Sequence, residues 1–299
     1  MPHTLRTFHV DAFTRTRGGG NPAIVALDAA HLDAAAMQRL ASEHHQSEWV
    51  FVLPATTTDA DLDVRFFGPR KEMPFVGHAT LAAHAVLAQL DPRPLRRQRG
   101  NTGIVEVRSH PDGGFSIHQP APALGRAPEA GELREVLTLL GLTPAQLDPR
   151  CAPRIAGGAS TRLLLALADT AALDGITPRL PELAALSPRL GAQGYFPFVL
   201  HTNGVGQPAT VARMFCPAIG IDEDPVSGNA HGMLGVYLHQ LGLLPVVAGV
   251  ARFTGQQGRH VGRPGEVQVT MEVDAADRPV AVSIAGHAVV GEEAPLRLA

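Results

Sequence analysis

The sequence predicts an α+β protein built from two similar halves, and three observations lead to this prediction. Short strand-like segments, each bounded by Gly, Pro, Asp or Asn, outnumber the helical segments. Strands and helices do not alternate regularly, as they would in a βαβ protein. The stretch 65–87 returns in altered form at 213–238, which indicates an internal repeat.

The expected strands are short apolar or alternating segments between turn residues. PDGG at 111–114 separates two of them and predicts a hairpin turn. The expected strands cover residues 5–13, 23–27, 48–54, 62–67, 103–109, 114–120, 161–167, 195–202, 210–215, 266–273 and 281–290.

The expected helices show apolar residues at a spacing of three to four. They cover residues 33–44, 78–90, 132–141, 180–191 and 229–242. Two of them, 78–90 and 229–242, are rich in small residues and apolar on several sides, so we expect them to be buried.

Composition excludes several classes of function. The 299 residues are 45% apolar and carry a net charge of -3, which argues against a nucleic-acid or membrane surface. The basic stretch 93–99 is interpreted as a solvated loop. The sequence shows neither a long apolar run nor a secretory signal, and Cys151 and Cys216 form no CxxC pair. We therefore expect a soluble cytoplasmic protein with reduced cysteines.

No cofactor is expected, because neither a dinucleotide-binding glycine pattern nor a phosphate-binding loop occurs. The nearest approach to a metal cluster is Glu43, His44 and His45. Adjacent side chains rarely converge on one ion without distant ligands, so no metal is expected either.

The repeat has the same type of residue at matched positions of the two halves. In both copies a strand is followed by a turn containing Pro, then Gly, then an apolar helix. Because the first amides of a helix have no partner within it, the two helix starts are candidate sites for a carboxylate or phosphate. The matched pairs are Arg65 and Arg213, Phe67 and Phe215, Pro69 and Pro217, Glu72 and Glu223, Pro74 and Pro225, Gly77 and Gly228, and Ala79 and Ala230.

Simpler interpretations of the same residues stay open. Glu223 and Asp224 could serve only as acidic residues that favour the following helix. His78 could be a helix-start residue without a catalytic role, and Asn229 could be a helix cap.

Five motifs in order make the sequence recognisable: GGNPAIV (19–25), HHQSEWVFV (44–52), PFVGHATLAAH (74–84), RMFCPAIGIDEDPVSGNAHG (213–232) and GQQGRHVGRPG (255–265). Together they resemble the phenazine-biosynthesis PhzF family, which is similar in fold to diaminopimelate epimerase. The resemblance implies two pseudo-symmetric domains, each a bent mixed β-sheet half-barrel around a central helix, with the active site in the cleft between them. It places the domains at 1–120 and 121–287, lets the strand 288–299 return to the first, and implies a homodimer.

The resemblance also implies roles for single residues. Glu48 matches the proton-shuttling acid/base of the family, while His78 and Asp224 match positions that contact substrate and position or exchange protons. Asn21, Ser47, Gly77, Gly228 and Asn229 match substrate-binding positions. Since Glu48 precedes the apolar run WVFVLP, desolvation is expected to raise its pKa.

The implied function is a cofactor-independent isomerase that shifts a proton between carbons of a small carboxylate-bearing metabolite. Two alternatives remain: a silent protein that binds a metabolite or a protein partner, and a racemase or epimerase that uses Glu48 with a second base such as Asp224.

Three departures from the family bear on substrate and mechanism. Asn229 stands where the phenazine enzyme carries serine, which leaves the substrate open. Val76 and Ser227 stand where the epimerase relatives carry cysteine, which argues against a two-thiol mechanism. Trp49 follows Glu48, where threonine or alanine is usual in the family, and is expected to narrow the pocket.

Overall fold

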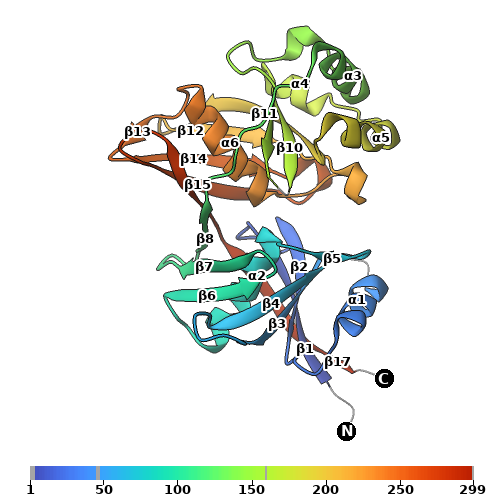
Figure 1. The fold of residues 1–299 in the computed structure, drawn as a ribbon, viewed down its shortest axis with the longest axis vertical. Helices are drawn as coiled ribbons and strands as arrows, with labels where there is room; N and C mark the ends of the chain where they lie inside the picture. Colours follow the sequence, from blue (N-terminus) through green and yellow to red (C-terminus); the bar gives the residue numbers. More distant parts are fainter. Residues whose placement is uncertain (1–3, 45–47, 159, 298–299) are drawn as a thin grey trace. The chain divides into compact units, whose positions relative to one another are not determined.

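The computed structural model describes residues 4–44, 48–158 and 160–297 (Figure 1). The chain divides into two compact units, unit 1 with residues 1–119 and 285–299, and unit 2 with residues 120–284. Within the described ranges, no helix has the length and apolar character needed to span a membrane.

Unit 1 is a mixed sheet with a helix on each face. Its helices are α1 (Ala34–Glu43) and α2 (Gly77–Leu90). Its strands are β1 (Thr4–Ala12), β2 (Asn21–Leu27), β3 (Glu48–Pro54), β4 (Leu62–Phe67), β5 (Glu72–Met73), β6 (Leu95–Gly100), β7 (Gly103–Ser109), β8 (Phe115–Pro120) and β17 (Ala288–Arg297). Strand β1 lies between β2 and β17 and is antiparallel to both.

The two faces of this sheet have separate apolar cores. Because successive side chains of a strand point to opposite faces, β3 contributes Val50 to the core around α2, and Trp49 and Phe51 to the core beside α1. Nine residues of α2 are buried, as expected from its small and apolar composition.

Unit 2 is a second mixed sheet, with α6 (Gly228–Gln240) buried along most of its length. Helices α3 (Ala130–Leu140), α4 (Thr170–Asp174) and α5 (Leu180–Leu190) share a separate apolar core with β10 and β11. The strands are β9 (Arg154–Gly157), β10 (Thr161–Ala166), β11 (Gly194–Thr202), β12 (Pro208–Ala212), β13 (Val246–Val247), β14 (Val250–Gln257), β15 (Gly265–Val273) and β16 (Pro279–Gly286), and short 3-10 turns lie at η1 (Pro144–Gln146), η2 (Pro217–Ile219) and η3 (Arg259–Val261).

The order of strand pairing is the same in both units. From β1 to β7 the successive pairs β1–β2, β2–β3, β3–β4, β4–β6 and β6–β7 are antiparallel, parallel, antiparallel, parallel and antiparallel. The pairs β9–β10, β10–β11, β11–β12, β12–β14 and β14–β15 repeat this order. The internal repeat predicted from the sequence is thus confirmed.

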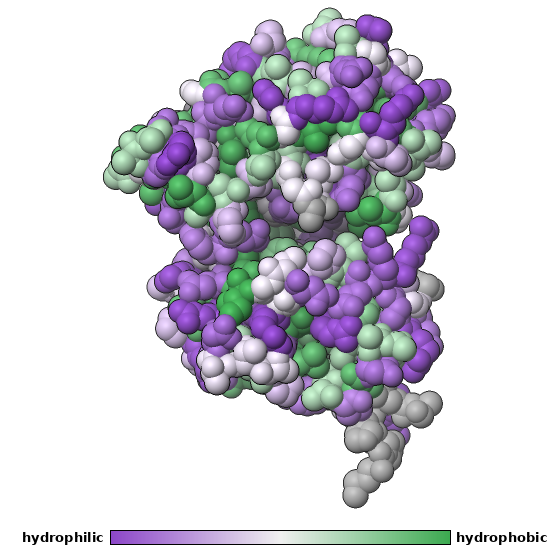
Figure 2. All heavy atoms as spheres, viewed as in Figure 1, coloured by the Kyte–Doolittle hydropathy of each residue, from purple (hydrophilic) through white to green (hydrophobic). Residues whose placement is uncertain are grey.

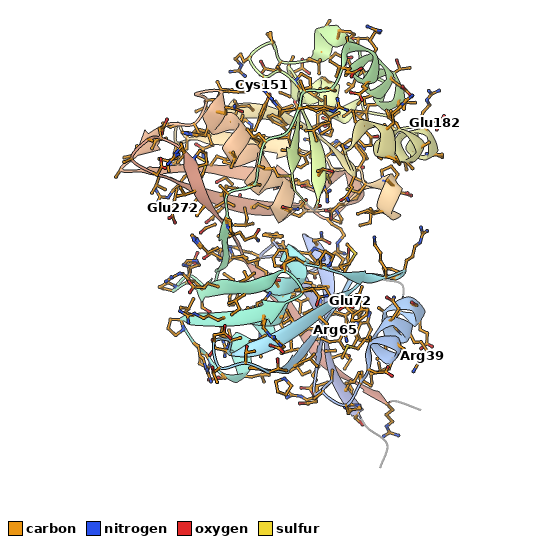
Figure 3. The ribbon with its side chains drawn as sticks, viewed as in Figure 1. Arg39, Arg65, Glu72, Cys151, Glu182 and Glu272 are labelled. Atoms are coloured by element: carbon orange, nitrogen blue, oxygen red, sulfur yellow. The ribbon has the colours of Figure 1, made fainter. Side chains whose placement is uncertain are left out.

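The repeat extends to two matched ion pairs. In unit 1 the guanidinium of Arg65 donates to both carboxylate oxygens of Glu72 at 2.9 and 2.8 Å, and the two side chains lie together in Figure 3. In unit 2 Arg213 donates to Glu223 at the same two distances. In both units, therefore, an arginine on β4 or directly after β12 fixes the acid that precedes the central helix.

Most expected elements form where the sequence places them, including all five helices and the 111–114 hairpin turn. The interpretation of 93–99 as a solvated loop is wrong, since β6 covers most of it and buries Arg96 and Gln98. Strand β14 was not expected, and the expected strand 281–290 is broken at His287 into β16 and β17.

Figure 2 shows hydrophilic and hydrophobic residues interspersed on the face drawn. The large apolar side chains that are exposed include Leu90, Ile104, Val205 and Val247, which lie far apart in the sequence and in both units. Single exposed apolar residues are ordinary on a protein surface.

Candidate active site

Glu48 and His78 lie together in unit 1. Glu48 begins β3, and its register partner Ala23 on β2 belongs to the core around α2. His78 is the second residue of α2. Oε2 of Glu48 lies 3.4 Å from Nε2 of His78, and the two side chains are 21% and 10% exposed. The structure thus brings two of the three expected catalytic side chains into contact in a largely desolvated place.

The electrostatics of Glu48 differ from expectation. Burial raises the pKa of Glu48, but the hydrogen bond and the positive charge of His78 together outweigh burial, so its pKa lies below the ordinary glutamate value. The expected rise was wrong because the sequence did not reveal that His78 faces the carboxyl group. A lowered pKa keeps Glu48 ionised at neutral pH, the state that can accept a proton.

Asn21 lies at the same end and on the same face of the sheet as Glu48. Strands β2 and β3 are parallel, and Glu48 pairs with Ala23. Asn21 lies two residues before Ala23 on β2, so its side chain points to the same face of the sheet as those of Ala23 and Glu48. Asn21 is only 3% exposed. The expected substrate-binding residue Ser47 lies outside the described residues.

Gly77 begins α2 beside this pair. Val76 precedes the helix, and its side chain makes no capping hydrogen bond. In the described part of the chain, the amide N–H groups of Gly77 and Ala79 find no acceptor. These groups point along the helix axis toward its amino end and can bind an anion there.

Trp49 does not face Glu48. Its ring is 2% exposed, stacks on Phe51 at 5.5 Å between ring centroids, and lies in the core beside α1. Adjacent residues of a strand point to opposite faces, so the expectation that Trp49 narrows the pocket of Glu48 is wrong. Trp49 instead borders a cavity of about 480 Å³ on the α1 side of the sheet, together with His9 and His44.

In unit 2, Asp224 lies in the turn before α6. Its backbone N–H donates to the carbonyl of Met214 at 2.8 Å, and its own carbonyl accepts from Nε2 of Gln257 at 2.6 Å. Its side chain is half-buried. The backbone on both sides of the Asp224 side chain is therefore fixed.

Ser227, not Asn229, caps α6. The Ser227 hydroxyl oxygen accepts from the backbone N–H of Ala230 at 3.4 Å, so the interpretation of Asn229 as a cap is wrong. Gly228 and Asn229 are the first two residues of the helix, and among the described residues their amide N–H groups have no acceptor. Two adjacent donors are thus left for an anion.

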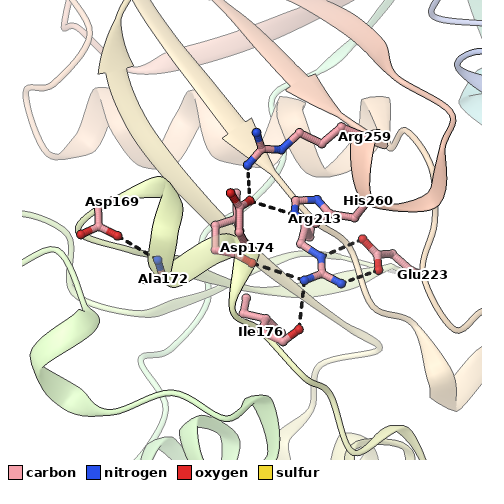
Figure 4. Close-up of polar contacts among 9 residues, drawn as sticks. Asp169, Ala172, Asp174, Ile176, Arg213, Glu223, Arg259 and His260 are labelled. Atoms are coloured by element: carbon pink, nitrogen blue, oxygen red, sulfur yellow. Dashed lines mark hydrogen bonds and ion pairs between the residues drawn. The ribbon is translucent and has the colours of Figure 1, made fainter.

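A polar network holds the segment that carries Asp224 (Figure 4). Arg213 donates to Glu223, and its Nη1 also donates to the carbonyls of Leu173 and Ile176 at 3.3 and 3.1 Å. Beside it Asp174 accepts from Arg259 and lies 2.8 Å from Nε2 of His260. This network ties the 255–265 motif and α4 to the strand that precedes Asp224.

Gln257 is the residue of this region that sequence reasoning missed. It belongs to the motif GQQG at 255–258, which was used for the resemblance but given no role. The signal that could have revealed it is a glutamine at the end of a strand, followed by a glycine that allows a close approach.

Among residues 4–44, 48–158 and 160–297, no cluster of three or more His, Cys, Asp or Glu side chains is arranged to hold an ion. His45 of the weighed Glu43, His44 and His45 group lies outside these ranges.

Comparison with known proteins gives the family. Residues 10–294 match the PhzC-PhzF family, described as "Phenazine biosynthesis-like protein". The chain is 36% identical over 291 residues to an uncharacterized isomerase, YddE, of Escherichia coli O157:H7, covering 95% of this chain and 96% of the relative. It is 30% identical over 282 residues to the trans-2,3-dihydro-3-hydroxyanthranilate isomerase of Pseudomonas aeruginosa, covering 93% and 94%.

A solved structure agrees with the sequence matches. The structure of a predicted epimerase from Pseudomonas aeruginosa superposes with a TM-score of 0.79 at 28% identity and covers 99% of this chain and all of the other. The expected α+β fold of two pseudo-symmetric units, each a mixed sheet around a central helix, is confirmed. The chain belongs to the phenazine biosynthesis-like PhzC-PhzF family and is an isomerase.

Proposed function

We propose that the protein is a cofactor-independent isomerase that moves a proton between two carbons of a small carboxylate-bearing metabolite. The observation that carries the proposal is the Glu48–His78 pair, at 3.4 Å, in a member of an isomerase family. Glu48 is held ionised by His78 and partly withdrawn from water, which suits a general base.

The proposed reaction balances without an external reactant. The Glu48 carboxylate takes a proton as a C–H bond breaks, and the electron pair moves into the adjacent π system. The double bond then shifts, and the protonated Glu48 returns the same proton to a second carbon. His78 stabilises the Glu48 carboxylate before the proton is taken and again after it is returned, and no atom is oxidised or reduced.

We further propose that residues of both units act on one substrate. In unit 1 the amino terminus of α2 and Asn21 accompany the Glu48–His78 pair. In unit 2 the amide N–H groups of Gly228 and Asn229 are two adjacent donors suited to a carboxylate. Donors fixed before the reaction stabilise negative charge that develops on the substrate.

The test uses trans-2,3-dihydro-3-hydroxyanthranilate, the substrate in the name of one relative, as the first probe. The wild type in D₂O should turn the probe over, and exchange of the shuttled proton with solvent should place deuterium at carbon. Glu48→Gln should lower the rate by about 10²- to 10⁴-fold, since general acid–base groups contribute that much. The control Glu43→Gln changes an exposed carboxylate on α1 and should leave the rate unchanged. Equal rates for wild type and Glu48→Gln would exclude Glu48 as the shuttle.

Epimerase activity is the second candidate, favoured by the likeness to a predicted epimerase. Asp224, fixed in its turn, would then serve as the second base. Inversion at a single carbon of a tested amino acid, lost in Asp224→Asn, would select this candidate. A ligand that stabilises the protein against heat but is never converted would favour a silent binding protein.

We also propose a homodimer in the cytoplasm. Cys151 and Cys216 are both buried and form no disulfide, which fits a reducing compartment. Light scattering of the purified protein would give the oligomeric state.

A further inference from the structure

Gln257 occupies an unusual place at the amino terminus of α6. It is the last residue of β14, and its side chain is 3% exposed. Its Nε2 donates to the carbonyl of Asp224 at 2.6 Å, and its Oε1 accepts from the backbone N–H of Ser227 at 3.1 Å. One buried amide therefore joins the two ends of the turn 224–227.

This arrangement replaces the usual hydrogen bond of a turn. In a tight turn the first carbonyl commonly accepts from the N–H three residues later, which here would join Asp224 and Ser227. The amide of Gln257 lies between these two groups and bonds to both. Pro225, the second residue of the turn, has no N–H to offer. The two ends of the turn are consequently linked through the Gln257 side chain of β14.

The other polar groups of Ser227 are used as well. Its hydroxyl oxygen accepts from Ala230, and its carbonyl lies 2.8 Å from Nδ1 of His231, a fully buried side chain. With its N–H bound to Gln257, Ser227 has little freedom to rotate. Within the described part of the chain, the donors left at the start of α6 are the amides of Gly228 and Asn229.

The two glycines of the GQQG segment lie close to His231 and to Pro225 of this turn. A Cβ on Gly255 would lie 2.0 Å from the His231 ring, so only glycine leaves room for that side chain. Gly258 has a φ of +92°, and a Cβ there would lie 2.7 Å from the carbonyl of Pro225. Glycines on both sides of Gln257 thus permit the close approach that its two hydrogen bonds require.

Among the described residues, unit 1 has no counterpart of the two hydrogen bonds that Gln257 forms. In the internal repeat, Leu62 on β4 corresponds to Thr210 on β12. Leu62 pairs with Gln98 on β6, and Thr210 pairs with Gly255 on β14. Counting two residues further, Gly100 of unit 1 corresponds to Gln257. Gly100 has no side chain that could bridge its turn, and α2 has no side-chain cap. The two helix starts therefore differ in how firmly their backbones are held.

We propose that Gln257 is a positioning residue of the isomerase, which sets the Asp224 backbone and the two amides of α6 for binding one carboxylate. The proposal rests on the proposed function. Loss of the Gln257 amide should let the turn 224–227 relax to another hydrogen-bonding pattern. Binding and the proton transfer should then suffer, although Gln257 itself touches no reacting atom.

The experiment compares three variants. Gln257→Leu removes both hydrogen bonds at similar volume, and Gln257→Glu keeps an acceptor for Ser227 but removes the donor to Asp224. Gln256→Leu is the matched control, because Gln256 is the exposed neighbour on the same strand. Amide hydrogen exchange at Ser227 should rise about tenfold in Gln257→Leu, the factor expected for one lost hydrogen bond, and should stay unchanged in Gln256→Leu.

Kinetics with trans-2,3-dihydro-3-hydroxyanthranilate provide the second measurement. We expect kcat/KM to fall at least tenfold in Gln257→Leu and in Gln257→Glu, mainly through KM, with the pH profile set by Glu48 unchanged. Unchanged exchange at Ser227, or raised exchange with unchanged kinetics, would overturn the positioning role. If wild type itself fails to convert the probe or to exchange deuterium, the proposed function fails for this substrate, and exchange at Ser227 still decides whether Gln257 holds the turn.

Discussion

Replacing Glu223 by Gln should destabilise unit 2 more than the matched change in unit 1. The Arg213 and Glu223 side chains are 9% and 14% exposed, and Arg213 also lies 4.8 Å from the centroid of the Phe215 ring. Glu223→Gln leaves the buried guanidinium without a countercharge. Breaking a buried pair by removing one partner costs about 3–5 kcal/mol.

The matched pair gives the comparison. Arg65 and Glu72 have the same contact distances, but their side chains are 29% and 28% exposed. Water then solvates the arginine when its partner is lost, so Glu72→Gln should cost about 1–2 kcal/mol, between the values for exposed and buried pairs. The difference between the two variants measures the effect of burial at nearly constant geometry.

Urea unfolding monitored by hydrogen exchange of peptides from each unit would follow the two units separately. Glu182→Gln serves as the control, since Glu182 and Arg179 form an exposed pair at 3.6 Å and the change should cost about 0.5 kcal/mol or less. If Glu223→Gln and Glu72→Gln lower the free energy of unfolding equally, burial does not set the strength of these pairs.

Four further outcomes are expected. Burial lowers the pKa of His84 to about 4, so the neutral side chain contributes about 3 kcal/mol to the free energy of unfolding above pH 6.5. This contribution is lost as the pH falls from 6.5 toward 4. The loss of stability between pH 7 and pH 5, measured by urea unfolding, should therefore be smaller in His84→Gln than in the wild type. The hydrogen bond from Arg126 lowers the pKa of Glu132 to about 2, and an NMR titration of Arg126→Gln should find it raised toward 4.5. Gly258→Ala should lower the free energy of unfolding by about 2 kcal/mol or more, because residue 258 has a positive φ and the alanine Cβ would lie 2.2 Å from the carbonyl oxygen of Arg263. An unchanged melting temperature would contradict this. Trp49→Phe should leave KM for any substrate of Glu48 unchanged, and a change of tenfold would contradict the orientation of this ring.

Much of the fold could be predicted because the residues that specify it repeat. The pairs Arg65 with Glu72 and Arg213 with Glu223 occur at matched positions, so one half supports the interpretation of the other. Strands β6 and β14 escaped prediction because their sequences, LRRQRG and VARFTGQQ, are polar. Gln98 of β6 and Gln257 of β14 are buried and form hydrogen bonds with residues distant in sequence, which a pattern of hydropathy cannot show.

The motifs indicated Glu48 and His78, which the structure brings into contact, but they did not indicate the electrostatics of Glu48. A motif can place Glu48 at the start of a strand, but it cannot show whether the pKa of Glu48 is raised or lowered. That shift depends on His78, which lies 30 positions away in the sequence and 3.4 Å away in the fold. Trp49 was assigned to the wrong face because a neighbour in sequence on a strand is not a neighbour in space. Side-chain direction, more than residue identity, limited the prediction.

Strand β17 has a consequence for how the protein is made. It pairs with β1 from Thr4 opposite Arg297 to Ala12 opposite Ala288, so unit 2 is inserted within the sequence of unit 1. During synthesis the first unit cannot complete its sheet until the last strand leaves the ribosome, whereas unit 2 is complete earlier. Until then the edge of β1 that pairs with β17 is exposed. During this interval the edge can pair with another nascent chain or be bound by a chaperone.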